Sequence, residues 1–160
     1  MCKTAESPAI TLVPMRASGE PVALSAESAL HSDPAAVAVT AADCELTYAE
    51  LDRWSNRLAR MLLALGARPG ARIVIADVPK LEAIVSRLAI TKTGATPVPF
   101  TTETTSARAD FGITTKEGRD RITDPARWLV LDDRSTLVQY LTGSDEPITD
   151  AELYLARKAS

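Results

Sequence analysis

Cysteine, histidine and aromatic residues are scarce in this sequence, and these scarcities limit the sites and the folds that we expect. The 160 residues include two cysteines, Cys2 and Cys44, far apart and without a CxxC pair, and a single histidine. We therefore expect neither a metal site nor a disulfide framework. Because aromatics make up only 4%, small aliphatic side chains supply most of the apolar content. That composition favours helices packed on a sheet over a β-sandwich.

Long apolar runs and a strong net charge are also missing. No segment approaches the roughly 18 apolar residues of a membrane span, and the first residues contain no apolar region of signal-peptide length. The formal net charge is -3, with 24% charged residues, so the sequence has no basic excess of the kind that binds nucleic acid. We expect a cytoplasmic protein that binds neither membranes nor nucleic acid.

The predicted organisation is a short arm followed by one α/β unit. Residues 1–21 mix four Pro and Gly positions with small polar residues and are expected to form a flexible N-terminal arm. Residues 22–160 are expected to form the folded unit, since a chain with 46% apolar residues can bury a core. A short helix is predicted near residues 24–30, and a turn is predicted at 31–34, before and at Pro34.

Local patterns then predict a hairpin and a long helix. Residues 36–39 and Leu46 indicate two short strands around a polar tip at 41–43. Thr47 and Glu50 have the spacing of a capping box, which starts a helix at Tyr48. Behind it, apolar residues recur at three- and four-residue steps for about five turns, up to Gly66. They are Leu51, Trp54, Leu58, Met61, Leu62 and Leu65, whereas Asn56, Arg57 and Arg60 fall elsewhere on the helical wheel.

The following segments alternate between strand and helix, which predicts a mostly parallel sheet flanked by helices. Strands are predicted at 72–76, 95–98, 111–115 and 128–131, with Pro97 restricting the second to an edge. Pro79 opens a helix whose buried stripe is predicted to be Leu81, Ile84, Val85 and Leu88. Another helix follows Asp132 and Asp133, and residues 149–152 repeat the capping box before a last helix. Residues 101–110 are predicted to be loop or short helix.

No residue pattern for nucleotide chemistry stands out. The sequence contains neither GxGxxG nor GxxxxGK[ST], and residues 142–145, with one glycine and no following lysine, are interpreted as a polar turn. His31 has no obvious orienting carboxylate, and Cys44 has no base to hold it as a thiolate, so we interpret them as a surface histidine and a structural thiol.

Two acidic residues and two tryptophans are the remaining candidates for functional residues. Asp132 and Asp133 end a predicted strand, where acidic ligands of Mg²⁺ are often found, but a helix cap is the simpler interpretation. Trp54 and Trp128 are interpreted as core or subdomain-contact residues. We therefore assign no catalytic, cofactor-binding or metal-ligating residue.

Several strings resemble the peptide-synthetase adenylation domains of the AMP-forming enzymes. LTYAEL at 46–51 matches their first core motif, LTYxEL, and residues 88–100 resemble their second, LAVLKAGAAYVPLD. Residues 56–75 resemble the intervening NRLAR…LGVRPGDRVAI stretch, and 34–39 resemble the PDAIAV lead-in. Clear similarity covers roughly 24–100, and the segments at 109–115, 128–133 and 147–153 resemble a linker found in some actinobacterial peptide synthetases.

The resemblance implies the front section of an adenylation domain, a layered βαβ fragment of the N-terminal subdomain. Such enzymes use Mg-ATP to activate amino or fatty acids as acyl-adenylates, then pass the acyl group to phosphopantetheine or CoA. Their phosphate loop, adenine and ribose contacts and catalytic lysine come later than this sequence extends, so we expect a truncated chain that is inactive alone and needs no cofactor. Thr93, Pro97 and Thr101 depart from the second motif, where alanine, an aromatic and aspartate are usual.

Two other functions are kept open. A non-catalytic interaction protein would self-associate or dock onto a synthetase or carrier-protein partner through the subdomain face that normally meets the missing part. A small doubly wound protein that binds Mg²⁺ and nucleotide would need Asp132 or Asp133 as a metal ligand.

Overall fold

The computed structural model describes residues 33–41, 44–100, 109–123 and 127–158. The predicted arm at 1–21, the helix near 24–30, His31 and most of the loop at 101–110 lie outside these ranges. The chain divides into two compact units, Met1–Asp52 and Arg53–Ser160, which are described separately below. In the described residues, no helix combines the length and apolarity needed to cross a membrane.

The first unit contains the predicted hairpin and the predicted helix start. Strands β1 (Val37–Ala41) and β2 (Cys44–Thr47) pair antiparallel. The Thr47 Oγ1 atom accepts a hydrogen bond from the Glu50 backbone N–H at 3.2 Å, and the Glu50 carboxylate accepts from the Thr47 N–H at 3.0 Å. This reciprocal pair satisfies two donors at the helix end. Helix α2 (Tyr48–Ala64) begins where the capping box predicts.

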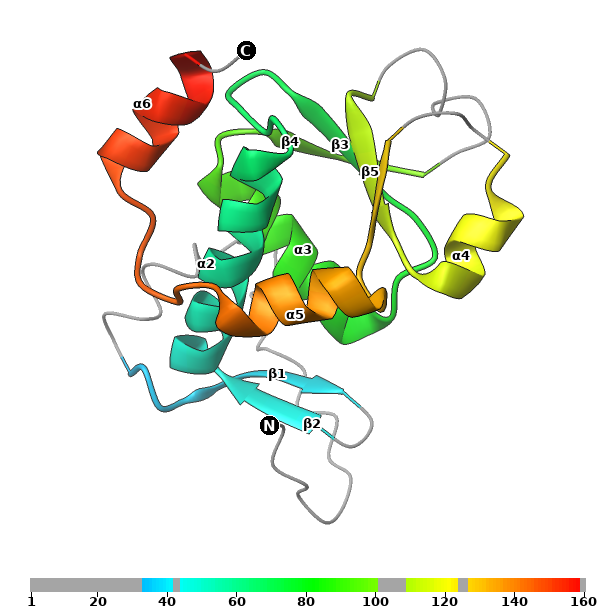
Figure 1. Cartoon of the computed structure of the whole chain (residues 1–160). Coiled ribbons are helices and arrows are strands. Elements are labelled where there is room, and N and C mark those ends of the chain that lie inside the picture. The colour runs from blue at the N-terminus through cyan, green and yellow to red at the C-terminus, as the bar shows by residue number, and fades with distance from the viewer. Residues whose placement is uncertain (1–32, 42–43, 101–108, 124–126, 159–160) are drawn as a thin grey trace, which may run out of the picture. The chain divides into compact units, whose positions relative to one another are not determined.

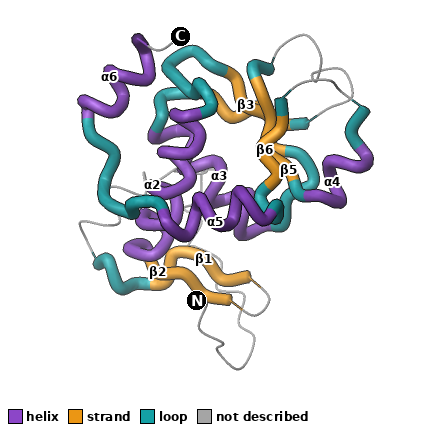
Figure 2. Tube along the Cα trace, in the orientation of Figure 1, coloured by secondary structure: helices purple, strands orange, loops and turns teal. Residues whose placement is uncertain are grey.

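In the second unit, four parallel strands form one sheet in the order β4-β3-β5-β6 (Figures 1 and 2). The strands are β3 (Arg72–Ile75), β4 (Thr96–Pro99), β5 (Phe111–Thr114) and β6 (Trp128–Val130). Every residue of β5 is buried, whereas β4, at the edge, exposes three of its four residues. The predicted parallel sheet is confirmed, and Pro97 lies in an edge strand as its missing amide requires.

Helix α3 (Lys80–Lys92) follows Pro79 and lies against β3 and β4 (Figure 1). Its buried residues are Val85, Ser86, Ala89 and Ile90. The predicted stripe is therefore wrong for Leu81, Ile84 and Leu88, which are only half-buried. Small side chains at 86 and 89 bring this face of the helix close to its neighbours, so the buried stripe is rotated from the one that the largest apolar residues indicated.

Three further helices complete the second unit (Figure 2). Helix α4 (Lys116–Arg121), which no sequence pattern predicted, is capped by Thr115, whose side chain accepts from the Gly118 N–H. Helix α5 (Arg134–Thr142) starts after Asp133, as predicted. Before α6 (Asp150–Lys158), Thr149 and Glu152 form the second predicted capping box. Of the core residues, Val74, Ala76, Val98 and Ile122 form a cluster against which Trp128 packs.

Candidate functional site

The carboxyl ends of the parallel strands carry the two aspartates singled out in the sequence. The Asp132 carboxylate accepts from the Lys116 backbone N–H at 2.7 Å, and the Asp133 carboxylate accepts from the Ser135 N–H at 3.0 Å. Hydrogen bonds from the Ser135 side chain and backbone lower the pKa of Asp133, and Lys116 adds to this effect. Both carboxylates therefore serve helix starts, which confirms the capping interpretation. Among the described residues, no group of three or more acidic, Cys or His side chains is arranged to hold a metal.

The other single residues have structural roles wherever they are described. Cys44 is half-buried and disulfide-bonded, so its interpretation as a structural thiol is wrong. Trp128 packs on the core cluster and meets Phe100 edge to face, with ring centroids 6.5 Å apart. His31 lies outside the described residues.

Thr142 ends α5, and residues 143–145 form a polar connection that is hydrogen-bonded to α2. The carbonyl oxygen of Asp145 accepts from the Asn56 side-chain amide at 2.9 Å, and its carboxylate pairs with Arg57 at 3.1 Å. Asn56 is 1% exposed, and its Oδ1 accepts from the Lys92 ammonium at 2.5 Å. The polar-turn interpretation is thus supported, and the turn joins α2 to the end of the chain.

Arg60 extends this connection towards α6. Its guanidinium donates to the Glu152 carboxylate at 2.8 Å and to the carbonyl oxygens of Ser144, Glu146 and Pro147 at 3.1, 2.6 and 3.1 Å. The hydrogen bond from the Thr149 backbone N–H lowers the pKa of Glu152 against the opposing effect of burial, and Arg60 lowers it further. We call Asn56, Arg57, Arg60, Lys92, Asp145 and Glu152 the α2 polar network.

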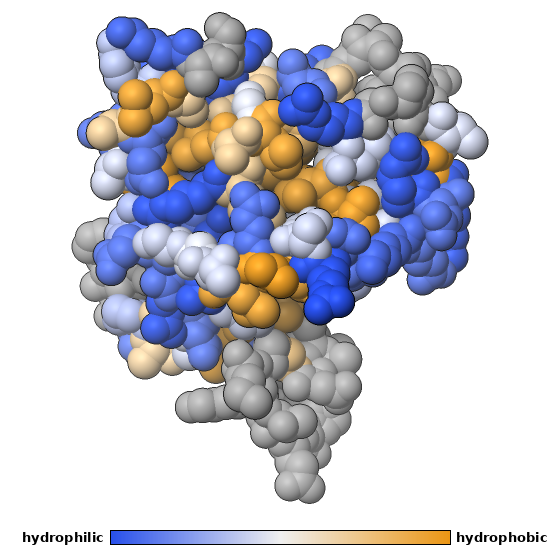
Figure 3. All heavy atoms as spheres, viewed as in Figure 1, coloured by the Kyte–Doolittle hydropathy of each residue, from blue (hydrophilic) through white to orange (hydrophobic). Residues whose placement is uncertain are grey.

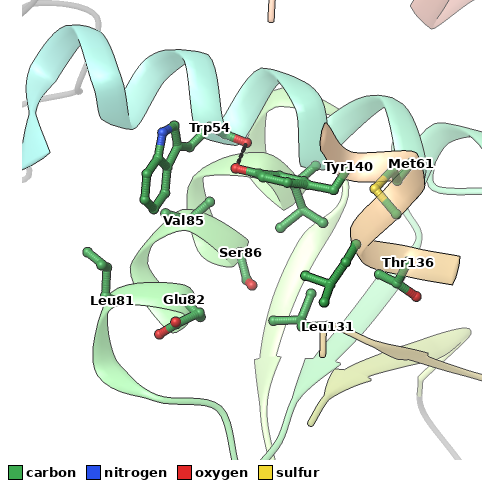
Figure 4. A pocket seen from close by; sticks show the side chains of 11 residues that line it. Trp54, Met61, Leu81, Glu82, Val85, Ser86, Leu131, Thr136 and Tyr140 are labelled. Carbon is green, nitrogen blue, oxygen red and sulfur yellow. Dashed lines mark hydrogen bonds between the residues drawn. The ribbon is translucent and has the colours of Figure 1, made fainter. Parts of the chain in front are cut away.

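A mostly apolar, partly open pocket of about 230 Å³ is lined by residues of α2, α3 and α5 and by Leu131 (Figure 4). Its walls include Trp54, Met61 and Val85. The Tyr140 hydroxyl donates to the Trp54 carbonyl oxygen at 3.3 Å and so joins α5 to α2 across the pocket. Burial raises the pKa of Tyr140 to about 12, despite the opposing charge of Arg57. No sequence pattern predicted the pocket, because its walls come from separate segments.

The arrangement of strands and helices agrees with what is found in known proteins. The model of the AMP-binding enzyme family matches residues 26–142, which is more than half of the chain. The chain belongs to the AMP-binding enzyme family. This match covers both adenylation motifs identified in the sequence, together with the parallel sheet and α5.

Peptide synthetases are among the relatives of this AMP-binding chain. A linear gramicidin synthase of Brevibacillus parabrevis is 32% identical over 135 residues, which cover 79% of this chain and 2% of the relative. The phosphinothricin tripeptide synthetase PhsC of Streptomyces viridochromogenes is 40% identical over 84 residues, covering 52% and 8%. The chain therefore spans a small part of the length of these curated relatives.

Solved structures show the same fold. The nonribosomal peptide synthetase FmoA3 matches with a TM-score of 0.63 and 26% identity, over 78% of this chain and 14% of FmoA3. MatB from Rhodopseudomonas palustris matches with a TM-score of 0.58 and 26% identity, over 73% and 27%. The predicted α/β architecture of the adenylate-forming enzymes is thus confirmed, and this AMP-binding chain corresponds to part of that domain.

Proposed function

We propose that these 160 residues supply structural scaffold of an adenylate-forming domain and do not by themselves bind ATP or form an acyl-adenylate. In open α/β sheets, ligands bind beyond the carboxyl ends of the strands. Here the acidic side chains at that edge are used as helix caps: Asp132 binds the Lys116 N–H and Asp133 binds the Ser135 N–H. That use of both carboxylates is the observation that carries the proposal.

The glycines support the same proposal. A phosphate loop needs several backbone amides exposed around an anion, usually through closely spaced glycines before a helix. The positive-φ glycines among the described residues, Gly66, Gly70 and Gly94, follow helices or form turns instead. Activation of an amino or fatty acid with Mg-ATP, as in the complete family, would then depend on residues beyond those in this sequence.

Calorimetric titration with Mg-ATP tests this proposal. Once circular dichroism has shown that the purified chain is folded, we expect no heat of binding at millimolar Mg-ATP or with a non-hydrolysable acyl-adenylate analogue. A complete adenylation domain titrated in the same buffer provides the positive control. Saturable binding at micromolar concentration would contradict the scaffold proposal. Its loss in the double variant Asp132→Asn, Asp133→Asn would favour the doubly wound Mg²⁺ and nucleotide protein instead.

Exposed apolar side chains on the last two helices favour a second candidate, docking to a synthetase or carrier partner or to another copy. On α5, Val138 is 55% and Leu141 is 68% exposed, and on α6, Tyr154 and Leu155 are 55% and 65% exposed. Figure 3 shows hydrophobic surface over the α5 region of this face. Such residues are costly to leave in water when they lie together.

Light scattering should show a larger species for the wild type and a monomer for Leu141→Lys. A monomeric wild type that also fails to bind a synthetase or carrier domain contradicts docking.

A further inference from the structure

The pocket between α2, α3, α5 and Leu131 has the mostly apolar lining of a small-molecule site, and its size suits a very small ligand. Its volume of about 230 Å³ exceeds that of engineered apolar cavities of about 150 Å³, which bind benzene. Trp54, Leu58 and Val85 give it aromatic and aliphatic walls, and all lining residues belong to the second unit. A ligand with an apolar body would replace missing dispersion contacts at these walls.

One polar group in the wall is left without a partner. Ser86 is 0% exposed, and its Oγ atom makes no hydrogen bond among the described residues. Hydroxyls in helices commonly bond to the carbonyl one turn earlier, as Thr91 does to Arg87 in the same helix at 3.0 Å. Figure 4 shows the Ser86 hydroxyl pointing from α3 towards Leu131, on the side where the pocket lies.

The remaining polar groups narrow the class of ligand. The Tyr140 hydroxyl already donates a hydrogen bond to the Trp54 carbonyl oxygen. The buried hydroxyl of Ser86 has no such partner among the described residues, so a ligand could supply one. Among the described residues that line the pocket, Glu82 alone is charged, and it would repel a carboxylate. Burying an anion without a cationic partner is unfavourable.

We propose that this pocket binds a small, uncharged, mostly apolar molecule with one hydrogen-bonding group, which pairs with the Ser86 hydroxyl. Phenol has this chemistry, and toluene matches it in size but lacks the hydroxyl. The inference does not depend on the absence of ATP binding, because neither of the capped aspartates at the sheet edge lines the pocket.

Nuclear magnetic resonance with the ¹⁵N-labelled full chain provides the test. Phenol should shift the indole N–H signal of Trp54, which lines the pocket, and leave that of Trp128 unchanged. The variant Trp128→Phe assigns the two signals. We expect phenol to bind roughly fivefold more tightly than toluene, the usual effect of one hydrogen bond. Benzoate should not bind at the same concentrations.

Substitution of Ser86 is expected to change the affinity for phenol and the stability of the chain in opposite directions. Ser86→Ala should reduce the phenol affinity to that of toluene and leave toluene binding unchanged, while raising the melting temperature because an unsatisfied buried hydroxyl is removed. Thr91→Ala, on the same helix but with a hydroxyl that is already bonded, is the matched control and should leave both affinities unchanged. Leu137→Phe, which fills the pocket from its exposed side, should weaken both ligands.

Three outcomes would overturn the proposal. The first is a Trp54 signal that does not move at millimolar phenol, and the second is equal affinity of the wild type for phenol and toluene. The third is an equal shift of the Trp54 and Trp128 signals, which would indicate non-specific binding. The comparison of the two ligands in the wild type does not require any variant to fold.

Discussion

Replacing Arg60 by alanine should lower the free energy of unfolding by roughly 2 to 3 kcal/mol and release α6 from α2. The guanidinium bonds to one carboxylate and three backbone carbonyls in the segment 144–152. In the alanine variant, the carboxylate and the three carbonyl oxygens would accept hydrogen bonds from water instead of from the guanidinium. The estimate is lower than the sum of separate charged hydrogen bonds, because Glu152 is 35% exposed and its attraction to Arg60 is screened.

Urea unfolding measures this loss, and limited proteolysis reports whether α6 is released. Arg53→Ala is the matched control, since Arg53 lies on the same helix with an exposed side chain, and it should change stability by less than about 0.5 kcal/mol. Arg60→Lys should recover only part of the loss, because one ammonium cannot reproduce the forked geometry of a guanidinium. Equal stabilities of Arg60→Ala and Arg53→Ala would show that the network contributes nothing to holding α6.

Replacing Gly112 by alanine should cost about 2 to 3 kcal/mol through overpacking. Gly112 lies in the buried strand β5, directly opposite Trp128 of β6. A Cβ atom at this position would overlap the indole ring, including Cη2 at 2.7 Å. The ring has little room to withdraw, because it packs on the core cluster and against Phe100.

A double-mutant cycle tests whether this clash is the cause. Trp128→Ala by itself should destabilise the chain by removing a packed aromatic side chain. In the background of Trp128→Ala, Gly112→Ala should become nearly neutral, so the two effects should not add. Thermal unfolding of the four proteins gives the coupling energy. Additive losses would mean that Gly112 is required for a reason other than the approach of Trp128.

Element positions were well predicted where the deciding interactions are local. Both capping boxes, at Thr47 and Thr149, involve residues three apart, so their hydrogen bonds depend little on the rest of the fold. The parallel strands were predicted from short apolar runs between helical segments, and the family was recognised from strings such as LTYAEL at 46–51. Helix α4 was missed because six residues are too few for a periodic pattern.

The candidate sites depended on contacts that local patterns do not contain. Asn56 and Arg60 were placed on the polar side of α2, yet Asn56 is buried and both bind residues more than 80 positions later. Ser86 is polar, but the close packing of α3 buries it beside the pocket.

Capping, hydrophobic periodicity and short motifs are local, so the amino-acid sequence alone was enough to predict the starts of α2, α3, α5 and α6, the strand segments and the family. The folded structure was needed to show which polar residues are buried, how residues 144–152 are bonded to α2, and that residues of three helices line a pocket. Burial and long-range hydrogen bonds depend on which surfaces meet, and residues distant in sequence meet only after the chain has folded.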